Sequence, residues 1–269
     1  MSTQSQSQSQ GTAVITGASS GIGAVYADRL ARRGYDLLLI ARDAQALSTV
    51  AAELASTGRR VEVLAADLTN KAELRGVEER LRSDASITAL VNNAGFGGAA
   101  GLLKSEVDTL ENMIDLNVTA LTRLTAALLP KLVARGSGTI INVSSIVAVN
   151  PEALNGTYSG TKAYVLSFTQ ALHNELKGTG VRVQAVAPGA TATKFWGRFG
   201  VPLSYFKDES IMSAEDCVDA GLAGLDQGEL VTFPTIGDDA ALKAFEAARV
   251  GLYPHLLNKN AAPRYGIRS

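Results

Sequence analysis

Short apolar runs alternate with helical patterns along most of this chain, and this alternation constrains the fold more than any other feature. The runs cover residues 12–16, 37–41, 61–65, 87–91, 139–143, 181–186 and 229–233. Residues 37–41 are apolar at every position, which is typical of a strand buried on both faces. Strands that alternate with helices form parallel sheets. The sequence therefore predicts an α/β fold: a doubly wound, Rossmann-type parallel sheet of about seven strands with helices on both faces.

Helices are expected between these runs, and several carry end signals. Asp43 can cap a helix that continues to Gly58, and Ser213 with Asp216 can cap a later one after an irregular stretch. The longest helical patterns cover residues 105–135 and 156–177.

A single domain is expected from residue 11 to residue 269, because 46% hydrophobic content can form one large core. Residues 1–10 are rich in Ser and Gln and lack the apolar stretch of a secretory signal, so they are predicted to be a disordered tail. Segment 234–269 fits no further strand–helix unit. It can form a lid, a dimer contact or an extra helix, and the sequence leaves the three open.

Charge and cysteine usage exclude several classes of partner. The net charge of −1 gives no electrostatic reason to expect nucleic acid or an anionic membrane, and the apolar runs are too short to cross a bilayer. The only cysteine is Cys217, so no intrachain disulfide can form, as suits a reducing cytoplasm. With His173 and His255 far apart, no metal cluster is expected. We expect a cytoplasmic protein.

A glycine-rich loop, Thr-Gly-Ala-Ser-Ser-Gly-Ile-Gly at residues 16–23, joins the first strand to the first helix. A dinucleotide pyrophosphate would meet backbone N–H groups and the positive end of a helix dipole there. Gly17, Gly21 and Gly23 remove side chains where the chain turns tightly. The spacing differs from the commoner dinucleotide fingerprint, and glycine in such a turn can serve geometry alone.

The end of the second strand indicates which dinucleotide is bound. Ala41 stands where an NAD-specific site usually has an acidic residue, and the next residue, Arg42, can bind a 2′-phosphate through two hydrogen bonds. Ser19 could add a hydroxyl contact. Alternatively, Arg42 is an ordinary solvated residue at a helix start. We expect NADP(H) to be preferred, with NAD(H) possible.

Tyr158 and Lys162 are four residues apart on a predicted helix, so their side chains share one face. Ionising a phenol of pKa ~10 at neutral pH costs about 4 kcal/mol. An ammonium about 5 Å away contributes on the order of 3 kcal/mol at an effective dielectric of ~20. One lysine can therefore supply most of the shift that makes tyrosine an acid or base near neutrality. A bare pair at this spacing is more often a surface pair, so its context decides.

That context is an ordered series of motifs. The glycine loop is followed by Asn92-Asn-Ala-Gly95, Asn117, Ser144-Ser145, the Tyr–Lys pair and Pro188-Gly189. In this combination the sequence resembles the classical short-chain dehydrogenase/reductase family over about residues 11–233.

The resemblance implies roles for the residues at matching positions. Tyr158 would be the general acid for carbonyl reduction and the base for alcohol oxidation, and Lys162 would hold the nicotinamide ribose and lower the pKa of Tyr158. Ser145, rather than Ser144, would hydrogen-bond the substrate oxygen. Asn117 would complete a proton relay through water and Lys162.

The resemblance also implies a set of cofactor-binding residues along the carboxyl ends of the strands. Asp67 and Leu68 would flank the adenine, Asn93, Ala94 and Gly95 would line the groove, and the segment after the sixth strand would meet the nicotinamide. The full set is Gly17, Ser19, Ser20, Gly21, Ile22, Gly23, Arg42, Asp67, Leu68, Asn93, Ala94, Gly95, Tyr158, Lys162, Pro188, Gly189, Thr191 and Thr193. Taken singly, Asp67 could be a turn cap, Asn117 a helix-surface amide and Pro188-Gly189 a turn.

Segment 190–212 would cover the substrate in such a protein. Five aromatic residues fall within it: Phe195, Trp196, Phe199, Tyr205 and Phe206. They favour an apolar or aromatic carbonyl compound, although they could equally pack a loop or a subunit contact. The family further suggests a homodimer or homotetramer built from the helices at 105–135 and 156–177.

These observations predict an NADP(H)-dependent oxidoreductase that interconverts a carbonyl and a secondary alcohol by hydride transfer. One alternative is a methyltransferase that uses S-adenosylmethionine, but that chemistry also favours an acidic residue after the second strand, where Ala41 and Arg42 stand. A second alternative is a non-catalytic NADPH-binding regulatory protein. It would have no need to keep together the four residues Asn117, Ser145, Tyr158 and Lys162.

Overall fold

The computed structural model describes residues 9–98 and 100–267. The chain forms two compact units, Met1–Pro234 and Thr235–Ser269. Residues 1–8 of the predicted disordered tail lie outside the described residues, whereas the backbone N–H of Gln10 donates to the Gly34 carbonyl at 3.1 Å. The predicted domain limits, 11–269, stay a prediction.

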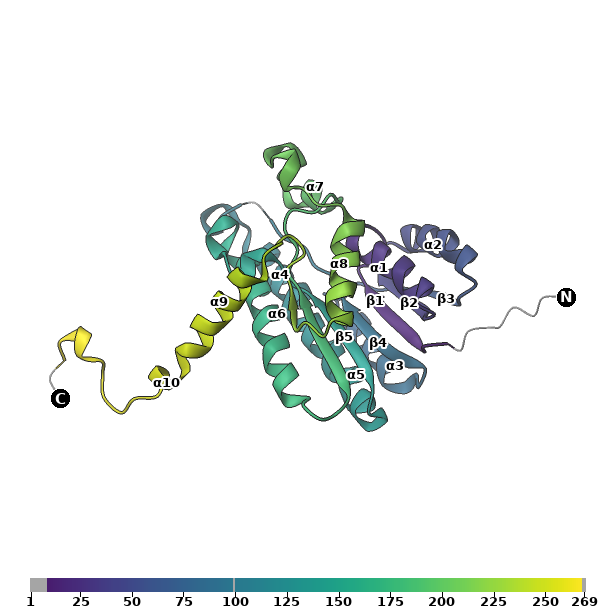
Figure 1. Cartoon of the computed structure of the whole chain (residues 1–269). Coiled ribbons are helices and arrows are strands. Elements are labelled where there is room, and N and C mark those ends of the chain that lie inside the picture. Colours follow the sequence, from purple (N-terminus) through teal and green to yellow (C-terminus); the bar gives the residue numbers. More distant parts are fainter. Residues whose placement is uncertain (1–8, 99, 268–269) are drawn as a thin grey trace. The chain divides into compact units, whose positions relative to one another are not determined.

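The first unit is built on a seven-stranded parallel sheet, which confirms the predicted fold class (Figure 1). The strand order is β3-β2-β1-β4-β5-β6-β7. The strands are β1 (Thr12–Thr16), β2 (Asp36–Ala41), β3 (Val61–Ala65), β4 (Ile87–Asn92), β5 (Gly138–Val143), β6 (Val181–Val186) and β7 (Val231–Thr232). The order reverses between β1 and β4, where a doubly wound sheet opens its ligand crevice.

Helices connect successive strands. They are α1 (Gly21–Arg32), α2 (Ala44–Glu53), α3 (Lys71–Ser83), α4 (Val107–Ile114), α5 (Leu121–Arg135), α6 (Gly156–Glu175), α7 (Phe195–Phe199) and α8 (Ala214–Asp226). The helical pattern at 105–135 is therefore two helices, joined by a π-helical segment, Asp115–Ala120. The stretch expected to be irregular contains the short helix α7.

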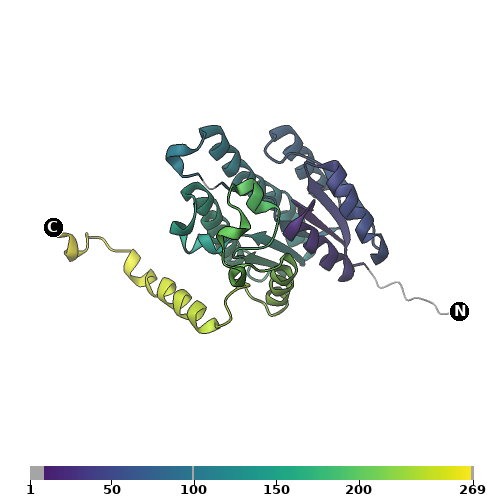
Figure 2. The same cartoon turned by 90° about the horizontal axis from the view of Figure 1, so that it is seen from above.

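The core forms one layer on each face of the sheet, because successive side chains of a strand point to opposite faces. Ile15 and Leu39 pack with residues of α1, α2 and α8. Val14 and Leu38 pack with residues of α3, α5 and α6 on the other face. Figure 2 shows the sheet between its two helical layers.

The predicted caps are present. The carboxylate of Asp43 accepts from the Ala46 N–H at 2.9 Å. The Ser213 hydroxyl accepts from the Asp216 N–H at 2.9 Å and donates to the Asp216 carboxylate at 2.7 Å. Gly58 follows α2 and its last short turn with a positive φ of 68°. The last strand is shorter than the predicted 229–233, since only Val231 and Thr232 pair with β6.

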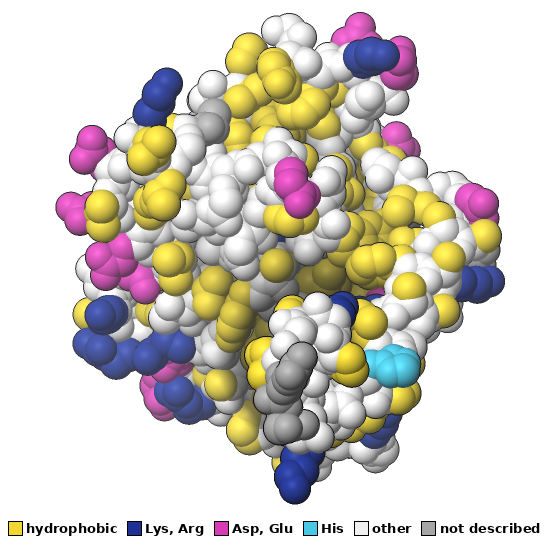
Figure 3. All heavy atoms as spheres, turned by 90° about the vertical axis from the view of Figure 1, so that its left-hand side faces the viewer, with side chains coloured by type: hydrophobic (Ala, Val, Ile, Leu, Met, Phe, Trp, Pro, Cys, Tyr) yellow, Lys and Arg dark blue, Asp and Glu magenta, His cyan; other side chains and the backbone are white. Residues whose placement is uncertain are grey.

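The second unit contains α9 (Asp239–Gly251) and α10 (Tyr253–Leu256), so segment 234–269 includes helical structure. It exposes apolar side chains such as Phe245 and Leu256. The first unit also exposes Leu102 and Leu103 before α4. Hydrophobic side chains are visible at the surface in Figure 3, together with charged ones. Among the described residues, no helix has the length and apolarity needed to span a membrane.

Candidate active site

Four buried polar residues expected at the site lie near the carboxyl ends of the strands. Asn117 lies in the π-helical segment, Ser145 follows β5, and Tyr158 and Lys162 lie on α6. Each is at most 8% exposed. The carboxyl ends of parallel strands meet at one edge of a sheet, and that edge is where such folds bind ligands.

Asn155 sets the position at which α6 begins. Its side-chain oxygen accepts from the backbone N–H groups of Thr157 at 2.8 Å and Tyr158 at 3.1 Å. Its side-chain nitrogen donates to the Ala100 carbonyl. This cap places Tyr158 in the first turn of the helix. Sequence reasoning missed Asn155, although an Asn at the residue before a helix is a common start signal.

The two adjacent serines after β5 have different partners. The Ser144 hydroxyl donates to the Lys162 carbonyl at 2.8 Å and so ties α6 to the end of β5. The Ser145 hydroxyl donates to the Pro188 carbonyl at 3.5 Å and accepts from the Val147 N–H at 3.3 Å, and its interaction with Tyr158 lowers the pKa of the phenol. Ser145 is thus the serine that faces the phenol.

Lys162 is buried beside the phenol ring. Its Nζ lies 5.8 Å from the Tyr158 ring centroid and donates to the Val143 carbonyl at 2.8 Å. Burial lowers the pKa of Lys162 to about 8, because the ammonium loses its hydration shell.

Tyr158 itself is in an environment that opposes ionisation. Burial raises the pKa of Tyr158, and the hydrogen bond from Ser145 lowers it by less. Lys162 was expected to lower this pKa, but desolvation prevails in this arrangement, where the ammonium hydrogen-bonds the Val143 carbonyl. The phenol is therefore protonated near neutral pH in this arrangement.

Asn117 connects the loop after β4 to α6. Its side-chain oxygen accepts from the Phe96 N–H at 3.0 Å, and its nitrogen donates to the Phe96 carbonyl at 2.9 Å and to the Thr161 hydroxyl at 3.0 Å. At 2% exposure it is not a helix-surface amide. It holds the loop after β4 against α6 at Thr161, the residue before Lys162.

The glycine loop is fastened to the loop after β4 by Thr16 and Asn93. The Thr16 hydroxyl accepts from the N–H groups of Asn93 and Ala94, both at 3.0 Å. The Asn93 amide donates to the carbonyls of Thr16 at 2.9 Å and Gly17 at 3.1 Å. Thr16 was not among the predicted site residues, since a threonine inside an apolar strand gives no separate signal.

The glycine loop has the shape of a phosphate-binding turn. Gly17 has a positive φ of 67°. A Cβ on Gly23 would lie 2.3 Å from the Gly17 carbonyl oxygen, so no side chain fits where α1 meets the loop. Ser20, the residue before α1, makes no side-chain hydrogen bond that caps the helix. This leaves a helix N-terminus that suits a pyrophosphate.

The residues after β2 and β3 bear on the adenosine end. Arg42 is exposed directly after β2, and the neighbouring carboxylate, Asp43, is engaged in its own helix cap. Burial alone would raise the pKa of Asp67, but hydrogen bonds from Thr69, with the charge of Arg42, lower it. Asp67 therefore caps a turn, which is the alternative to an adenine contact that the sequence left open. It is also close enough to Arg42 for the two charges to interact. Leu68 is buried.

The segment after β6 approaches both loops. The Pro188 carbonyl accepts from the Ile146 N–H at 3.0 Å, directly after Ser145. A Cβ on Gly21 would lie 3.0 Å from a Thr193 methyl carbon, so Thr193 faces the glycine loop. The Thr191 hydroxyl donates to the Gly189 carbonyl at 3.2 Å. These contacts bring the predicted nicotinamide-end residues to the same edge as Tyr158.

Aromatic side chains of α7 cover the Tyr158 ring, and Figure 1 shows α7 beyond one end of the sheet. The ring centroid of Tyr158 lies 5.6 Å from that of Phe199 and 5.9 Å from that of Phe195. Trp196 packs on Phe199 and on Phe206. Tyr205 is 77% exposed and lies at the margin of this cluster.

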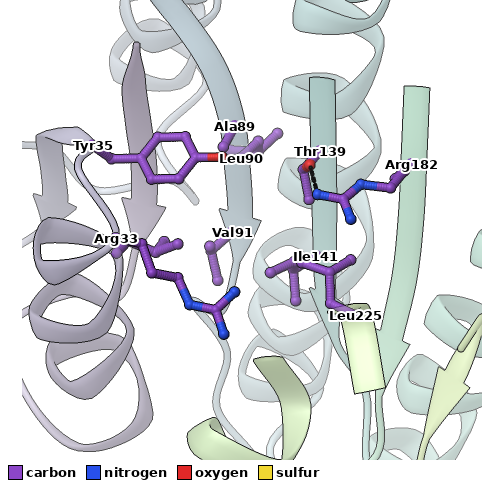
Figure 4. A pocket seen from close by; sticks show the side chains of 10 residues that line it. Arg33, Tyr35, Ala89, Leu90, Val91, Thr139, Ile141, Arg182 and Leu225 are labelled. Carbon is purple, nitrogen blue, oxygen red and sulfur yellow. Dashed lines mark hydrogen bonds between the residues drawn. The ribbon is translucent and has the colours of Figure 1, made fainter. Parts of the chain in front are cut away.

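A separate small pocket lies on the α1 and α8 face of the sheet (Figure 4). Ala89, Val91 and Ile141 line its apolar part, and the guanidinium groups of Arg33 and Arg182 lie at its sides. Arg33 already pairs with Asp226 at 2.8 Å. None of the predicted catalytic residues lines this pocket, so we do not place the reaction there.

A family model described as short chain dehydrogenase matches residues 11–200. The chain belongs to the short-chain dehydrogenase family. It resembles a short-chain dehydrogenase from Sphingobium yanoikuyae solved in complex with NADPH, with 46% identity, a TM-score of 0.91 and coverage of 95% of this chain and 100% of that one.

Two further relatives are informative. The bulky-bulky ketone specific alcohol dehydrogenase from Comamonas testosteroni is 39% identical, with a TM-score of 0.88 and coverage of 96% of this chain and 99% of that chain. The 17-beta-hydroxysteroid dehydrogenase type 3 of Homo sapiens is 37% identical over 186 residues, which is 67% of this chain but only 59% of that protein. The chain is thus an oxidoreductase of a family that acts on alcohol and carbonyl groups of small molecules with a nicotinamide cofactor.

Proposed function

We propose that this chain is an NADP(H)-dependent oxidoreductase that interconverts ketones bearing two bulky substituents and their secondary alcohols. The observation that carries the proposal is the joint burial of Ser145, Tyr158 and Lys162 under an aromatic cover. The likeness over nearly full length to a dehydrogenase specific for bulky-bulky ketones supports the substrate class.

The chain's own residues would handle the substrate oxygen and its proton. In reduction, the Tyr158 hydroxyl donates its proton to the carbonyl oxygen, and in oxidation it removes the proton from the alcohol. Ser145, which faces the phenol, donates a hydrogen bond to the same oxygen. Lys162 holds a positive charge near the phenol, which favours its ionised form.

The residues of the crevice fit a dinucleotide. The glycine loop and the N-terminus of α1 would bind its pyrophosphate, and Arg42 its 2′-phosphate. Asp67 and Leu68 would flank the adenine, and Asn93, Ala94 and Gly95 would line the groove. When bound, the dinucleotide supplies or accepts the hydride at the substrate carbon.

The NADPH-bound relative supports this cofactor, although an NAD-bound neighbour shares the fold. Hydrophobic cover over the phenol excludes water, which suits hydride chemistry.

Substitution of Tyr158 by Phe tests the proposal, because the ring and its contacts remain while the transferable proton is lost. We expect reduction of aromatic ketones with NADPH to fall by about a thousandfold or more, with NADPH binding retained. Near-normal turnover in Tyr158→Phe would contradict the assignment. Tight NADPH binding by the wild-type protein without turnover of any carbonyl compound would instead favour the non-catalytic regulatory alternative.

The cytoplasmic location and the homodimeric or homotetrameric assembly stay predictions. Light scattering of the purified protein tests the assembly, and a monomeric mass would contradict it.

A further inference from the structure

Gly97 lies between two aromatic rings of the site. A Cβ at this position would be 2.5 Å from Cε2 of Phe199 and 2.8 Å from Cδ2 of Tyr158. Gly97 is not among the glycines with positive φ, so an alanine could adopt its backbone conformation. The glycine is therefore required for space: it lets the rings of Phe199 and Tyr158 approach the loop together.

Phe199 is held in this position by its own helix. Its ring is 2% exposed and meets the Tyr158 ring edge to face at 81°. Trp196 packs against Phe199 with centroids 5.4 Å apart, and the Trp196 indole N–H donates to the Thr191 carbonyl at 2.8 Å. Trp196 therefore fixes α7 to the segment after β6, and this contact holds the Phe199 ring against the phenol of Tyr158.

A ketone whose oxygen contacts the Tyr158 hydroxyl must place its two substituents beside the phenol. The space on one side is filled by Phe199, and the segment 190–212 that carries it follows β6 directly. A large substituent must displace the Phe199 ring or stack against it, whereas a methyl group needs little of this space. Phe195 also contacts Tyr158, but it is only partly buried, and none of its atoms is among the three nearest to a Cβ at Gly97.

We propose that Phe199 and Gly97 together determine the size of the substrate group accepted beside Tyr158. Phe199 occupies space beside Tyr158 that the smaller of the two ketone substituents must share, and Gly97 provides the room into which the Phe199 ring fits. This inference rests on the proposed ketone reductase function and assigns its specificity to one residue of the loop after β4 and one residue of α7.

The test compares acetophenone, propiophenone and butyrophenone, whose alkyl groups grow by one methylene at a time, with NADPH as the reductant. In Phe199→Ala we expect the ratio of kcat/KM for butyrophenone to that for acetophenone to rise about tenfold or more. Phe245→Ala, which truncates an exposed phenylalanine of the second unit, is the matched control and should leave the ratio unchanged.

Gly97→Ala supplies an independent arm. Its methyl group would press on both rings, so kcat/KM should fall, and more for the larger ketones. In the Phe199→Ala background one of the two rings is gone, so the same Gly97→Ala substitution should cost several-fold less. The inference would be overturned if Phe199→Ala left the ratio unchanged and Gly97→Ala had an equal effect in both backgrounds.

Folding is checked by NADPH binding and the urea unfolding midpoint. If Phe199→Ala fails either check, Phe199→Leu and the single Gly97→Ala variant take its place. The inference is supported if Phe199→Leu raises the ratio of kcat/KM for butyrophenone to that for acetophenone and Gly97→Ala lowers it. Unchanged ratios in both variants overturn it. If the wild-type protein reduces none of the ketones, the proposed function fails and the inference falls with it. If the wild-type protein reduces them but no variant changes the ratio, only the inference fails.

Discussion

Replacement of Lys162 by Met should stabilise the cofactor-free protein at neutral pH. Lys162 is 6% exposed, and burial lowers its pKa from 10.5 to about 8. In the unfolded chain the ammonium regains water and its ordinary pKa of ~10.4. The folded protein therefore bears a penalty for carrying this charge, and methionine, which is of similar length and does not titrate, removes the penalty.

The sign and size follow from linkage between proton binding and folding. Between about pH 8 and about pH 10.5 the unfolded chain binds more protons at this site, so the wild-type free energy of unfolding rises with pH there. Below about pH 8 both states are protonated, and the full penalty, roughly 3 kcal/mol, applies. The lost hydrogen bond to the Val143 carbonyl offsets about 1 kcal/mol of the gain. We expect Lys162→Met to be more stable by about 2 kcal/mol at pH 7.

Urea unfolding, followed by circular dichroism at constant ionic strength, measures this difference. By about pH 9.5 roughly 2 kcal/mol of the penalty is relieved in the wild-type protein, so the two chains should then be nearly equal. The raised pKa of Tyr158 affects the free energy of unfolding only above about pH 10, where the phenol of the unfolded chain ionises first. The Cys217 thiol, whose pKa burial also raises, is present in both proteins, so its contribution cancels in their difference.

Lys177→Met is the control, because Lys177 is exposed just after α6. It should not change the pH dependence. An equal difference in the free energy of unfolding between wild type and Lys162→Met at both pH values would refute the burial penalty assigned to Lys162.

Three further predictions concern the cofactor preference and the scaffold. Arg42→Ala should weaken NADPH binding by about tenfold to a hundredfold while sparing NADH, as measured by fluorescence titration; equal losses for both would contradict the 2′-phosphate role. Asn155→Ala removes the cap of α6 and should cost about 1 kcal/mol in urea unfolding, with a fall in kcat greater than the change in NADPH affinity. The Asn142 side chain joins Asn92 of β4 to Thr169 of α6 at 2.9 Å each, so Asn142→Leu should destabilise by about 1–3 kcal/mol. An unchanged unfolding midpoint in either variant would show that the corresponding bonds do not contribute.

Much of the scaffold could be predicted because its signals are local. The fully apolar run that contains Leu38 reads as a strand buried on both faces, and β2 is buried between β1 and β3. Caps such as Asp43 and Ser213 involve residues three apart, so sequence spacing alone locates them. The prediction of a final strand at 229–233 was wrong, because only Val231 and Thr232 pair with β6, and pairing between strands is a tertiary contact that local sequence does not report.

For the site, the sequence by itself determined which residue types are present and in which order. The spacing of Ser145, Tyr158 and Lys162 is a property of the chain, and the resemblance to the family at this spacing selected Ser145 over Ser144 before any contact was known. Only the tertiary structure showed that Ser144 ties α6 to β5. It also showed that Thr16 joins two loops 77 residues apart through its hydroxyl.

The acid–base state of Tyr158 and the shape of its surroundings were likewise decided by the tertiary structure. Spacing predicted a lysine near the phenol, but burial under α7 raises the phenol pKa, and no local pattern reports how much water a fold removes. The contact of Phe199 with Tyr158 across Gly97 joins three segments that are distant in sequence. Local sequence determines elements and chemistry, whereas desolvation and steric fit arise only when distant segments pack together.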